Sequence, residues 1–525
     1  MKKLYLLILI CVISINYSFS QEVKIKVGSE IKTKTELVTM VGEFSDRMVG
    51  VFKQKKKYFL KSYNRNLSLI TTKDLELEYK GKKLIYSNAT KLNNRMFIFA
   101  KFTNKKAKKN YLLFKEVDPR TFKSVSQLKV IGEIPYESRR DNGFFGFEYS
   151  KDNNLLLLFH YIPTDDSENE KIAFKVFDSD LNLKWKKDIT IPYSSELTDI
   201  IDYNLDLEGN VYVVVKKYKN KREDIVNKKI NFTYTILTYK NNGDDKSNID
   251  LSLKDKYITQ LKIAIDKNQN IICSGFYSNN ISSKSERVNG LGGSFYMKIE
   301  NDDNEVSIST TNDFTLEFIS SLLSKRKKEK MKKKAKKKKK KGKELEMTNY
   351  YLDDLFLNDD GSVILVGEKS YSITHTVSNG QGGYTTTTTY YFHNIIAVEY
   401  DGEGDVKWVR RVPKFQSSNS TYYLSYASIV TNGSIYFIYN DHIENIHIKN
   451  EVDYKPFSLS YKKTNIVAYR INEEGETKYI KLKSAVKLGA MLVPSASTLI
   501  GKTNDLYLYI GRGKKERIAH LYFNE

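Results

Sequence analysis

The chain lacks most of the features that stabilise small secreted domains or anchor membrane proteins. Cysteine is nearly absent, because the 525 residues include only Cys11 and Cys273. Cys11 falls in an N-terminal apolar segment, so the remaining thiol has no internal disulfide partner, and we expect Cys273 to be a small buried side chain. No stretch after residue 20 approaches the ~18 consecutive apolar residues that span a bilayer. Burial and strand pairing must therefore provide the stability.

Known catalytic and metal-binding motifs are also missing. The chain has no G-x-S-x-G elbow, no H-E-x-x-H, no P-loop and no cysteine pair with zinc spacing. Its six histidines are scattered, and His442 and His447 share one segment without a third clustered ligand. The acids of segments 178–182 and 302–305 resemble fragments of calcium loops, but tight turns between strands favour Asx turns there. We predict no cofactor and no metal site, and the balance is against an enzyme.

The first 20 residues predict a secretory signal peptide. Lys2 and Lys3 precede an apolar segment over 4–15, and Ser18 and Ser20 supply small residues before Gln21. The alternative is a buried N-terminal strand. With a signal peptide, we expect an exported protein of the periplasm or cell surface, either soluble or peripherally attached.

The formal charge of +23 comes mostly from one segment. Residues 325–343 contain fifteen Lys or Arg and one Glu, a net +14 that leaves +9 for the rest of the chain. Like charges repel and cannot pack, so the segment predicts a disordered, solvated insertion. Such a segment attracts an anionic glycan, a lipid surface or an acidic envelope protein, whereas nucleic acid is a poor partner after export. The lysines that we expect to make these contacts are Lys327, Lys328, Lys332, Lys333, Lys336, Lys337 and Lys338.

A short cassette recurs along the chain: a polar turn followed by a β-rich run. Examples are Glu208-Gly209-Asn210 before VYVVVKKY, Asn268-Gln269-Asn270 before IICSGFY, and Asp359-Asp360-Gly361 before SVILVGE. Each unit then continues with two more β runs around a tight turn, as in IIAVEYDGEGDVKWVRRV. Alternating apolar and polar residues between Asp, Asn and Gly turns predict strands and hairpins. Four strands, named a to d here, fit in each unit.

The units predict an all-β fold, a β-propeller of four-stranded antiparallel blades over residues 21–525. Eight b–c pairs are centred near residues 50, 97, 156, 213, 272, 364, 436 and 508. Eight blades are favoured and seven are the main alternative, because the first two units are degenerate; a β-sandwich array or solenoid is less favoured. The last unit ends at strand c, and EVKIKVGSEI at the N-terminus is a spare strand. We expect this strand to complete the last blade and hide both edges.

The lengths of the connections favour one face as the working surface. The a–b and c–d turns are short, whereas the b–c and d–a connections on the opposite face include the long insertions. The Lys-rich segment is one of them, and a Thr/Tyr-rich hairpin at 370–394 in the neighbouring unit is another. Either this hairpin is an elongated loop without a ligand, or it is a stacking or strand-pairing surface. In the second case the contacts are Tyr384, Tyr390, Tyr391 and His393.

The innermost strands carry one signal typical of enzymes. Two of the predicted a strands place acids near their starts, namely Asp199 and Asp202, and Asp353 and Asp354. Carboxylates that converge at a channel mouth can hold a cation or perform acid–base chemistry. Polar residues line a wet channel in any case, so these acids support only the alternative function.

Two hairpins resemble those of a known group of proteins. DSDLNLKW, which ends at Trp185, and DGEGDVKW, which ends at Trp408, are similar to the aspartate–glycine–tryptophan repeats of quinoprotein-like propellers. The whole cassette resembles bacterial exported β-propeller repeat proteins. The resemblance implies the fold, and it carries over no cofactor and no functional residue, because only two units have the tryptophan.

These observations predict a non-enzymatic binding or scaffold propeller at the cell envelope, which engages an anionic surface or protein partner through its basic long-loop face. The alternative is a channel-centred periplasmic hydrolase or oxidoreductase that uses the acids of the innermost strands.

Overall fold

The computed structural model describes residues 23–136, 143–162, 169–280, 290–378, 383–457, 459–499 and 506–523. The predicted signal peptide, with Cys11, lies outside these residues. No helix in the described part of the chain is both long and apolar enough to cross a bilayer. Cys273 is fully buried, as the sequence predicts.

Eight sheets of four or more strands make up most of the described chain, and we number them as blades in chain order. All their pairings are antiparallel, and blades 1 to 4 each run from strand a to strand d in sequence. Blade 1 consists of β3 (Glu36–Phe44), β4 (Arg47–Gln54), β5 (Lys57–Asn64) and β6 (Leu69–Asp74). Blade 2 consists of β9 (Ile85–Leu92), β10 (Arg95–Asn104), β11 (Lys109–Val117) and β12 (Lys129–Pro135). Blade 3 consists of β13 (Phe145–Tyr149), β14 (Leu156–Ile162), β15 (Asn169–Phe177) and β16 (Leu183–Ser194). Blade 4 consists of β17 (Thr198–Leu205), β18 (Val211–Tyr218), β21 (Phe232–Lys240) and β22 (Asp245–Leu251).

Blades 5 to 7 follow the same order, and blade 8 combines the two ends of the described chain. Blade 5 consists of β23 (Tyr257–Ile265), β24 (Ile271–Ser278), β26 (Gly293–Ile299) and β27 (Val306–Asp313). Blade 6 consists of β29 (Tyr350–Leu357), β30 (Val363–Ser378), β31 (Tyr384–Tyr400) and β32 (Val406–Val412), with β33 (Gln416–Ser418) paired to β31. Blade 7 consists of β34 (Ala427–Thr431), β35 (Ser434–His442), β36 (Thr464–Ile471) and β37 (Thr477–Ser484). Blade 8 consists of β38 (Met491–Leu492), β39 (Thr498–Leu499), β40 (Leu506–Arg512), β41 (Lys515–Phe523), β1 (Val23–Val27) and β2 (Ile31–Lys32).

The remaining elements are short and lie in the connections between strands. Three two-stranded pairs join β7 (Glu78–Tyr79) to β8 (Lys82–Lys83), β19 (Ile225–Val226) to β20 (Lys229–Ile230), and β25 (Gly290–Leu291) to β28 (Met347–Thr348). The α-helices are α1 (Leu316–Ser320), α2 (Lys325–Lys339) and α3 (Ala485–Leu488). The 3-10 helices are η1 (Ser195–Leu197), η2 (Asn241–Gly243), η3 (Ile443–His447), η4 (Glu451–Asp453), η5 (Tyr461–Lys463) and η6 (Pro494–Ala496).

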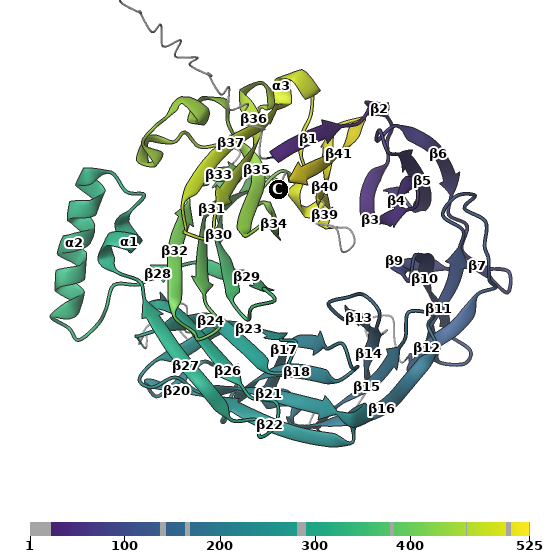
Figure 1. The fold of residues 1–525 in the computed structure, drawn as a ribbon, viewed down its shortest axis with the longest axis horizontal. Helices are drawn as coiled ribbons and strands as arrows, with labels where there is room; N and C mark the ends of the chain where they lie inside the picture. The colour runs from purple at the N-terminus through teal and green to yellow at the C-terminus, as the bar shows by residue number, and fades with distance from the viewer. Residues whose placement is uncertain are drawn as a thin grey trace, which may run out of the picture.

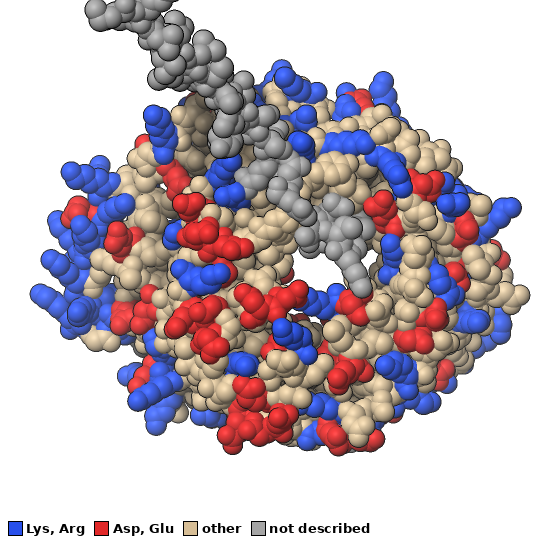
Figure 2. All heavy atoms as spheres, in the orientation of Figure 1, with Lys and Arg blue, Asp and Glu red and all other residues tan. Residues whose placement is uncertain are grey.

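The blades surround a central opening, and strand a of each blade lies innermost (Figure 1; the opening is also visible in Figure 2). The core is divided among the junctions between neighbouring blades. Each junction has its own buried apolar cluster, and one such cluster joins Met48 and Phe52 of blade 1 to Tyr509 and Ile518 of blade 8. Because every sheet buries both of its faces against neighbours, the ring has no open end among the described blades.

The N-terminal strand closes the ring, as the sequence predicts. β1 pairs with β41 in register from Val23 opposite Phe523 to Val27 opposite Ala519. The Val23 side chain is fully buried in the cluster that blades 7 and 8 share. The pairing covers the outer edge of β41, which is otherwise free to pair with another chain.

Local turn chemistry explains why the sequence repeats its Asp, Asn and Gly residues. In the a–b turn of blade 4, one carboxylate oxygen of Asp206 accepts hydrogen bonds from the backbone N–H groups of Glu208, Gly209 and Asn210 at 2.8–2.9 Å. Gly209 has a φ of +95°, which an L side chain rarely adopts. The same Asx arrangement recurs at Asp178 and Asp401, so these acids stabilise turns.

The two tryptophans each dock a blade onto the next blade. Trp185 of blade 3 donates its indole N–H to the carbonyl oxygen of Gly209 in blade 4 at 3.0 Å. Trp408 of blade 6 packs over Gly475 of blade 7, where an added Cβ would lie 2.7 Å from the Trp408 Cβ. The hairpins that resemble quinoprotein-like repeats therefore perform the same docking role at two of the junctions.

Candidate functional site

The long connections lie on one face of the ring, which we call the long-loop face. In an antiparallel blade, the a–b and c–d turns share one end, and the b–c and d–a connections share the other. The long-loop face therefore carries 219–231, 314–349, 443–463 and the outer part of the β30–β31 hairpin, in addition to the described ends of 279–292. The loop asymmetry that the sequence indicates is present in most blades, and the exception is the eleven-residue c–d connection 118–128 of blade 2.

The Lys-rich segment differs from the predicted disordered insertion, because Lys325–Lys339 forms the helix α2. Lysine has a good intrinsic helix propensity, but repulsion between lysines at i and i+4 opposes an isolated helix of this length. Contacts with the body of the propeller provide the stability that the charge repulsion removes from the helix. Lys328, Met331, Ala335 and Lys338 are half-buried, and their spacing of three and four residues places them on one face of the helix. Met331 packs with Phe318 against the cluster shared by blades 5 and 6.

The segments on both sides of α2 are also anchored. On the N-terminal side, the Arg411 guanidinium donates to the carbonyl oxygens of Phe318 and Ile319 in α1 at 3.3 and 2.9 Å. On the C-terminal side, Glu346 accepts hydrogen bonds from the Ser278 hydroxyl at 2.9 Å and the Asn279 backbone N–H at 2.6 Å. The helix is therefore held in place at the rim, where α1 and α2 lie outside the ring of sheets (Figure 1).

The outward face of α2 concentrates positive charge. The helix carries twelve Lys or Arg and one Glu, a net +11 over 15 residues or about 22 Å. Figure 2 shows Lys and Arg gathered at the edge of the molecule where Figure 1 places α2. Of the seven lysines singled out from the sequence, two are half-buried, Lys328 and Lys338, and five are exposed: Lys327, Lys332, Lys333, Lys336 and Lys337.

The Thr/Tyr hairpin is formed by the outer parts of β30 and β31, which pair as far as Ser378 opposite Tyr384. Residues 379–382, which join the two strands, lie outside the described residues. Cross-strand hydroxyl pairs, Thr374 with Thr388 and Thr376 with Thr386, lie 2.9 and 3.0 Å apart on one face of this ribbon. The ribbon is thus a polar extension of blade 6.

The four predicted contacts of this hairpin have different environments. Tyr384 is 77% exposed, whereas Tyr390 is half-buried and packs with Phe392 against Leu424 and Met491. Tyr391 stacks on Tyr371 with ring centroids 4.7 Å apart, and His393 meets both rings edge-on.

His393 is therefore an aromatic packing residue. Burial, together with the nearby charges of Lys414 and Lys369, lowers its pKa to about 4, so the ring is neutral at pH 7. Of the predicted contacts, only Tyr384 is freely available to a partner.

The central channel brings together side chains from four consecutive innermost strands. Asp202 of β17 and Asp354 of β29 lie close enough to Lys262 of β23 for its charge to oppose the rise of their pKa values, which burial causes. Glu148 of β13 joins them: burial and the charge of Asp202 raise its pKa to about 7, although Lys262 opposes the shift. The charge of one lysine thus acts on three carboxyl groups with raised pKa values.

The other two predicted channel acids point elsewhere. Asp199 pairs with Arg222 at 3.0 Å and accepts a hydrogen bond from the Tyr218 hydroxyl at 3.0 Å. Asp353 accepts a hydrogen bond from Tyr426 of blade 7 at 2.6 Å, and burial raises its pKa to about 7. The predicted set therefore divides, and only Asp202 and Asp354 belong to the channel cluster.

Sequence reasoning missed Glu148 and Lys262. Lys262 occupies the same position as Asp202 and Asp354, three residues before the end of its strand. An alignment of the innermost strands at their ends would have found it, whereas a search for acids at strand starts did not. No group of three His, Cys, Asp or Glu residues in the described ranges has the geometry to hold a metal ion.

The ring of four-stranded antiparallel sheets around a channel defines a β-propeller. No family model matches the chain, and no curated protein matches it.

Solved structures with a similar arrangement include the β-propeller domain of the trilobed protease from Pyrococcus furiosus, with 11% identity over 85% of this chain and 97% of that chain and a TM-score of 0.34. The WD40 domain of SCAP from fission yeast is 9% identical over 96% of this chain and 99% of that chain, with a TM-score of 0.38. An ulvan lyase is 9% identical over 93% of this chain and 95% of that chain, with a TM-score of 0.36. These likenesses concern the fold alone.

Proposed function

We propose that this protein is an exported, non-enzymatic binding module of the cell envelope that engages an anionic surface through its long-loop face. The observation that carries the proposal is α2, a helix of net +11 fixed to the rim by contacts at both ends. A helix that is already ordered loses little conformational entropy when it meets a charged surface. The exposed Tyr384 at the end of the neighbouring hairpin adds an aromatic contact on the same face.

Electrostatic attraction supplies the affinity in this proposal. A lysine near an anionic membrane surface contributes about 1 kcal/mol, and the attraction decays within a Debye length of about 10 Å at 0.1 M salt. Five exposed lysines on one helix therefore suffice for reversible attachment. The signal peptide predicted at 1–20 places the protein where lipid headgroups and acidic glycans are available.

Replacing five of the exposed lysines of α2 with glutamine is expected to weaken binding to anionic vesicles about 100-fold or more at 0.1 M salt, because each lost charge removes part of the attraction. The measurement is co-sedimentation with vesicles of phosphatidylcholine that contain about 30% phosphatidylglycerol, at several salt concentrations. The variant carries Lys327→Gln, Lys332→Gln, Lys333→Gln, Lys336→Gln and Lys337→Gln. Wild-type and variant proteins should converge near 0.5 M salt.

A matched control removes the same charge from other parts of the body. It carries five substitutions of exposed lysines away from the long-loop face: Lys123→Gln, Lys184→Gln, Lys246→Gln, Lys267→Gln and Lys481→Gln. If this control loses binding to the same extent, attachment depends on net charge and the role of α2 is rejected. If the wild-type protein ignores anionic vesicles at low salt, the lipid surface is rejected, and retention on an acidic glycan column separates that outcome from failure of the whole proposal.

The channel cluster supports a second candidate, a channel-centred hydrolase or oxidoreductase. Glu148 has a pKa of about 7, to which the charge of Asp202 contributes, so it can hold or release a proton near neutral pH. A carboxyl group with such a pKa is suited to acid–base catalysis. An enzyme of this kind keeps its turnover when the α2 lysines are replaced, which distinguishes it from the binding module.

Glu148→Gln is expected to flatten the dependence of stability on pH. The pKa of Glu148 is raised from 4.5 to about 7 in the folded protein, so the folded state holds the proton more tightly than the unfolded chain. Stability from this group is complete below pH 4.5 and is lost as the pH rises to about 7. Thermal unfolding midpoints between pH 4 and pH 8 should fall less in the variant than in the wild type. Substitution of the exposed Glu474 by Gln serves as control. Identical curves for wild type and Glu148→Gln would show that Glu148 is not protonated near neutral pH in the folded protein.

A further inference from the structure

A groove of about 400 Å³ lies between blades 2 and 3, away from both α2 and the channel cluster. Its walls come from strands β10, β11 and β12 of blade 2, and from β15, the 178–182 turn and β16 of blade 3. The apolar part is formed by Phe97, Phe114, Ile131 and Leu181. Its volume lies in the range of sites that bind small molecules.

The groove lies where other junctions have a tryptophan. At the junction of blades 3 and 4, Trp185 of strand d covers the c–d turn of the next blade, near Gly243, and bonds to Gly209. Strand d of blade 2 has no tryptophan, because the chain contains only Trp185 and Trp408. Lys129 and Val130 begin this strand and face the 178–182 turn across the groove. Ile131 is the third residue of this strand, as Trp185 is of β16, and its smaller side chain fills less of the junction than an indole does.

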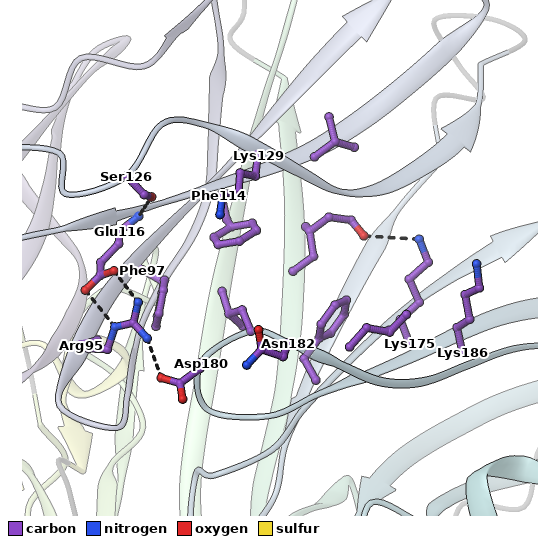
Figure 3. A pocket seen from close by; sticks show the side chains of 15 residues that line it. Arg95, Phe97, Phe114, Glu116, Ser126, Lys129, Lys175, Asp180, Asn182 and Lys186 are labelled. Carbon is purple, nitrogen blue, oxygen red and sulfur yellow. Dashed lines mark hydrogen bonds and ion pairs between the residues drawn. The ribbon is translucent and has the colours of Figure 1, made fainter.

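Charge is distributed unevenly along the groove, as Figure 3 shows. At one end, Arg95 forms two hydrogen bonds with Glu116, at 2.9 and 2.5 Å, and one with Asp180 at 2.5 Å. One guanidinium thus pairs with two carboxylates, so the cation at this end of the groove already has its anionic partners. Lys175 and Lys186 lie at the other end, with Phe114 between the two ends.

The lysines of the groove have no carboxylate partner within ion-pair distance among the described residues. Lys175 donates to the carbonyl oxygen of Ile131 at 3.3 Å, and no described group accepts a hydrogen bond from Lys129 or Lys186. Burial lowers the pKa of the half-buried Lys175, and the neighbouring charge of Lys186 lowers it too, whereas the more distant carboxylates of Glu133 and Asp188 oppose the shift. With Arg95, the lining has four cations and two carboxylates, so the groove keeps a net charge of +2.

We propose that this groove binds a small organic anion with an apolar body, such as an aromatic or aliphatic carboxylate. The apolar body lies on Phe97, Phe114, Ile131 and Leu181, and the anionic group accepts hydrogen bonds from Lys175 and Lys186, while Lys129 adds a positive charge beside Phe114. The anion relieves the repulsion between Lys175 and Lys186 and supplies the charge that the groove lacks. An apolar wall and a lysine end are both needed, so a free inorganic anion binds poorly. This site is independent of attachment through α2.

The test compares two fluorescent probes that differ in one charge. 8-Anilino-1-naphthalenesulfonate carries a sulfonate, whereas N-phenyl-1-naphthylamine has the same aromatic rings without it. Titration of the full chain with both probes is repeated for the double variant Lys129→Gln/Lys186→Gln. We expect the variant to bind the sulfonate at least tenfold more weakly at low salt, with a smaller difference at 0.5 M salt, and to bind the neutral probe as the wild type does.

A matched double variant, Lys228→Gln/Lys246→Gln, removes two exposed lysines of blade 4 outside the groove and should leave both titrations unchanged. The proposal is overturned if the wild type does not bind the sulfonate, or if the two double variants bind it equally. It is also overturned if Lys129→Gln/Lys186→Gln weakens the binding of both probes to the same extent, because the charges of the groove then do not distinguish the anion from the neutral molecule.

Discussion

Val23→Asp is expected to lower the free energy of unfolding by about 4 kcal/mol. Val23 is the first residue of β1 and has no exposed surface. Its side chain lies in the cluster of blades 7 and 8, with Ile429, Leu482 and Leu521 among its members. An aspartate there loses the apolar contacts and buries a charge without a partner, and the two costs add. Urea unfolding followed by circular dichroism gives the change.

The neighbouring residue provides the control. Lys24 lies on the same strand with its side chain exposed, so Lys24→Asp keeps the backbone pairing with Tyr522 and should unfold close to the wild type. Equal destabilisation by the two substitutions would mean that β1 contributes through charge or strand pairing and not through the buried side chain. An unchanged midpoint for Val23→Asp would mean that β1 does not close the ring in solution.

The closure has a second support between blades 8 and 1. Lys61 of β5 and Glu516 of β41 form an ion pair in which both side chains are 2% exposed. The Tyr509 hydroxyl donates to the other oxygen of Glu516 at 3.1 Å, and the Lys61 ammonium also bonds to Thr35 at 2.7 Å. Lys61 and Glu516 are 455 residues apart in sequence, so they come into contact only when the ring is complete. Ring closure thus combines apolar burial with a polar contact that depends on register.

The sequence predicted the propeller because each blade is specified locally. Turns such as 206–210 and 401–405 carry the Asp and Gly that an Asx turn requires, and the runs between them alternate at the strand period. The closing role of Val23–Val27 followed from counting strands: the last unit lacked one and the N-terminus had one to spare. Both arguments need only neighbours in sequence or the rule against open edges.

The helix α2 was not predicted because its stability comes from distant contacts. Composition alone indicates a repelling, solvated run, and Met331 and Ala335 are only two apolar residues among twelve basic ones. What holds the helix is the surface of Phe318 on α1 and the anchoring of Glu346 to Ser278 and Asn279. None of these contacts is visible in a local sequence window.

The channel cluster was predicted only in part because β-bulges change the direction of side chains. Register shifts between Ile200 and Asp202 in β17 and between Leu352 and Asp354 in β29 insert one residue in each of these two strands. Beyond a bulge, the alternation of inward and outward residues changes phase. Asp353 therefore turns toward Tyr426 of blade 7, while its neighbour Asp354 faces Lys262. The sequence contains the acids, but not the position of the bulges.

Lys414→Ala is expected to lower the free energy of unfolding by about 3–5 kcal/mol, because it leaves a carboxylate buried without its partner. Lys414 has no exposed surface, and its ammonium bonds to Glu368 at 2.5 Å, to the Phe392 carbonyl oxygen at 3.0 Å and to Gln416 at 3.1 Å. The ammonium thus has one ion pair and two hydrogen bonds at the junction of blades 6 and 7. Glu368 is 4% exposed and also accepts a hydrogen bond from Ser425 at 2.7 Å, which cannot compensate a lost cation.

A double-mutant cycle separates the pair from its parts. Glu368→Leu leaves Lys414 buried and unpaired, so it should destabilise the protein as strongly as Lys414→Met, whereas the double variant Lys414→Met/Glu368→Leu should lose much less than the sum of the two. Lys109→Ala serves as control, because it breaks a pair with Glu133 that is about half exposed on both sides and should leave the urea midpoint unchanged. Additive single effects would show that Lys414 and Glu368 act independently. The start of the Thr/Tyr hairpin, where the Phe392 carbonyl accepts a hydrogen bond from Lys414, would then be held by apolar packing alone.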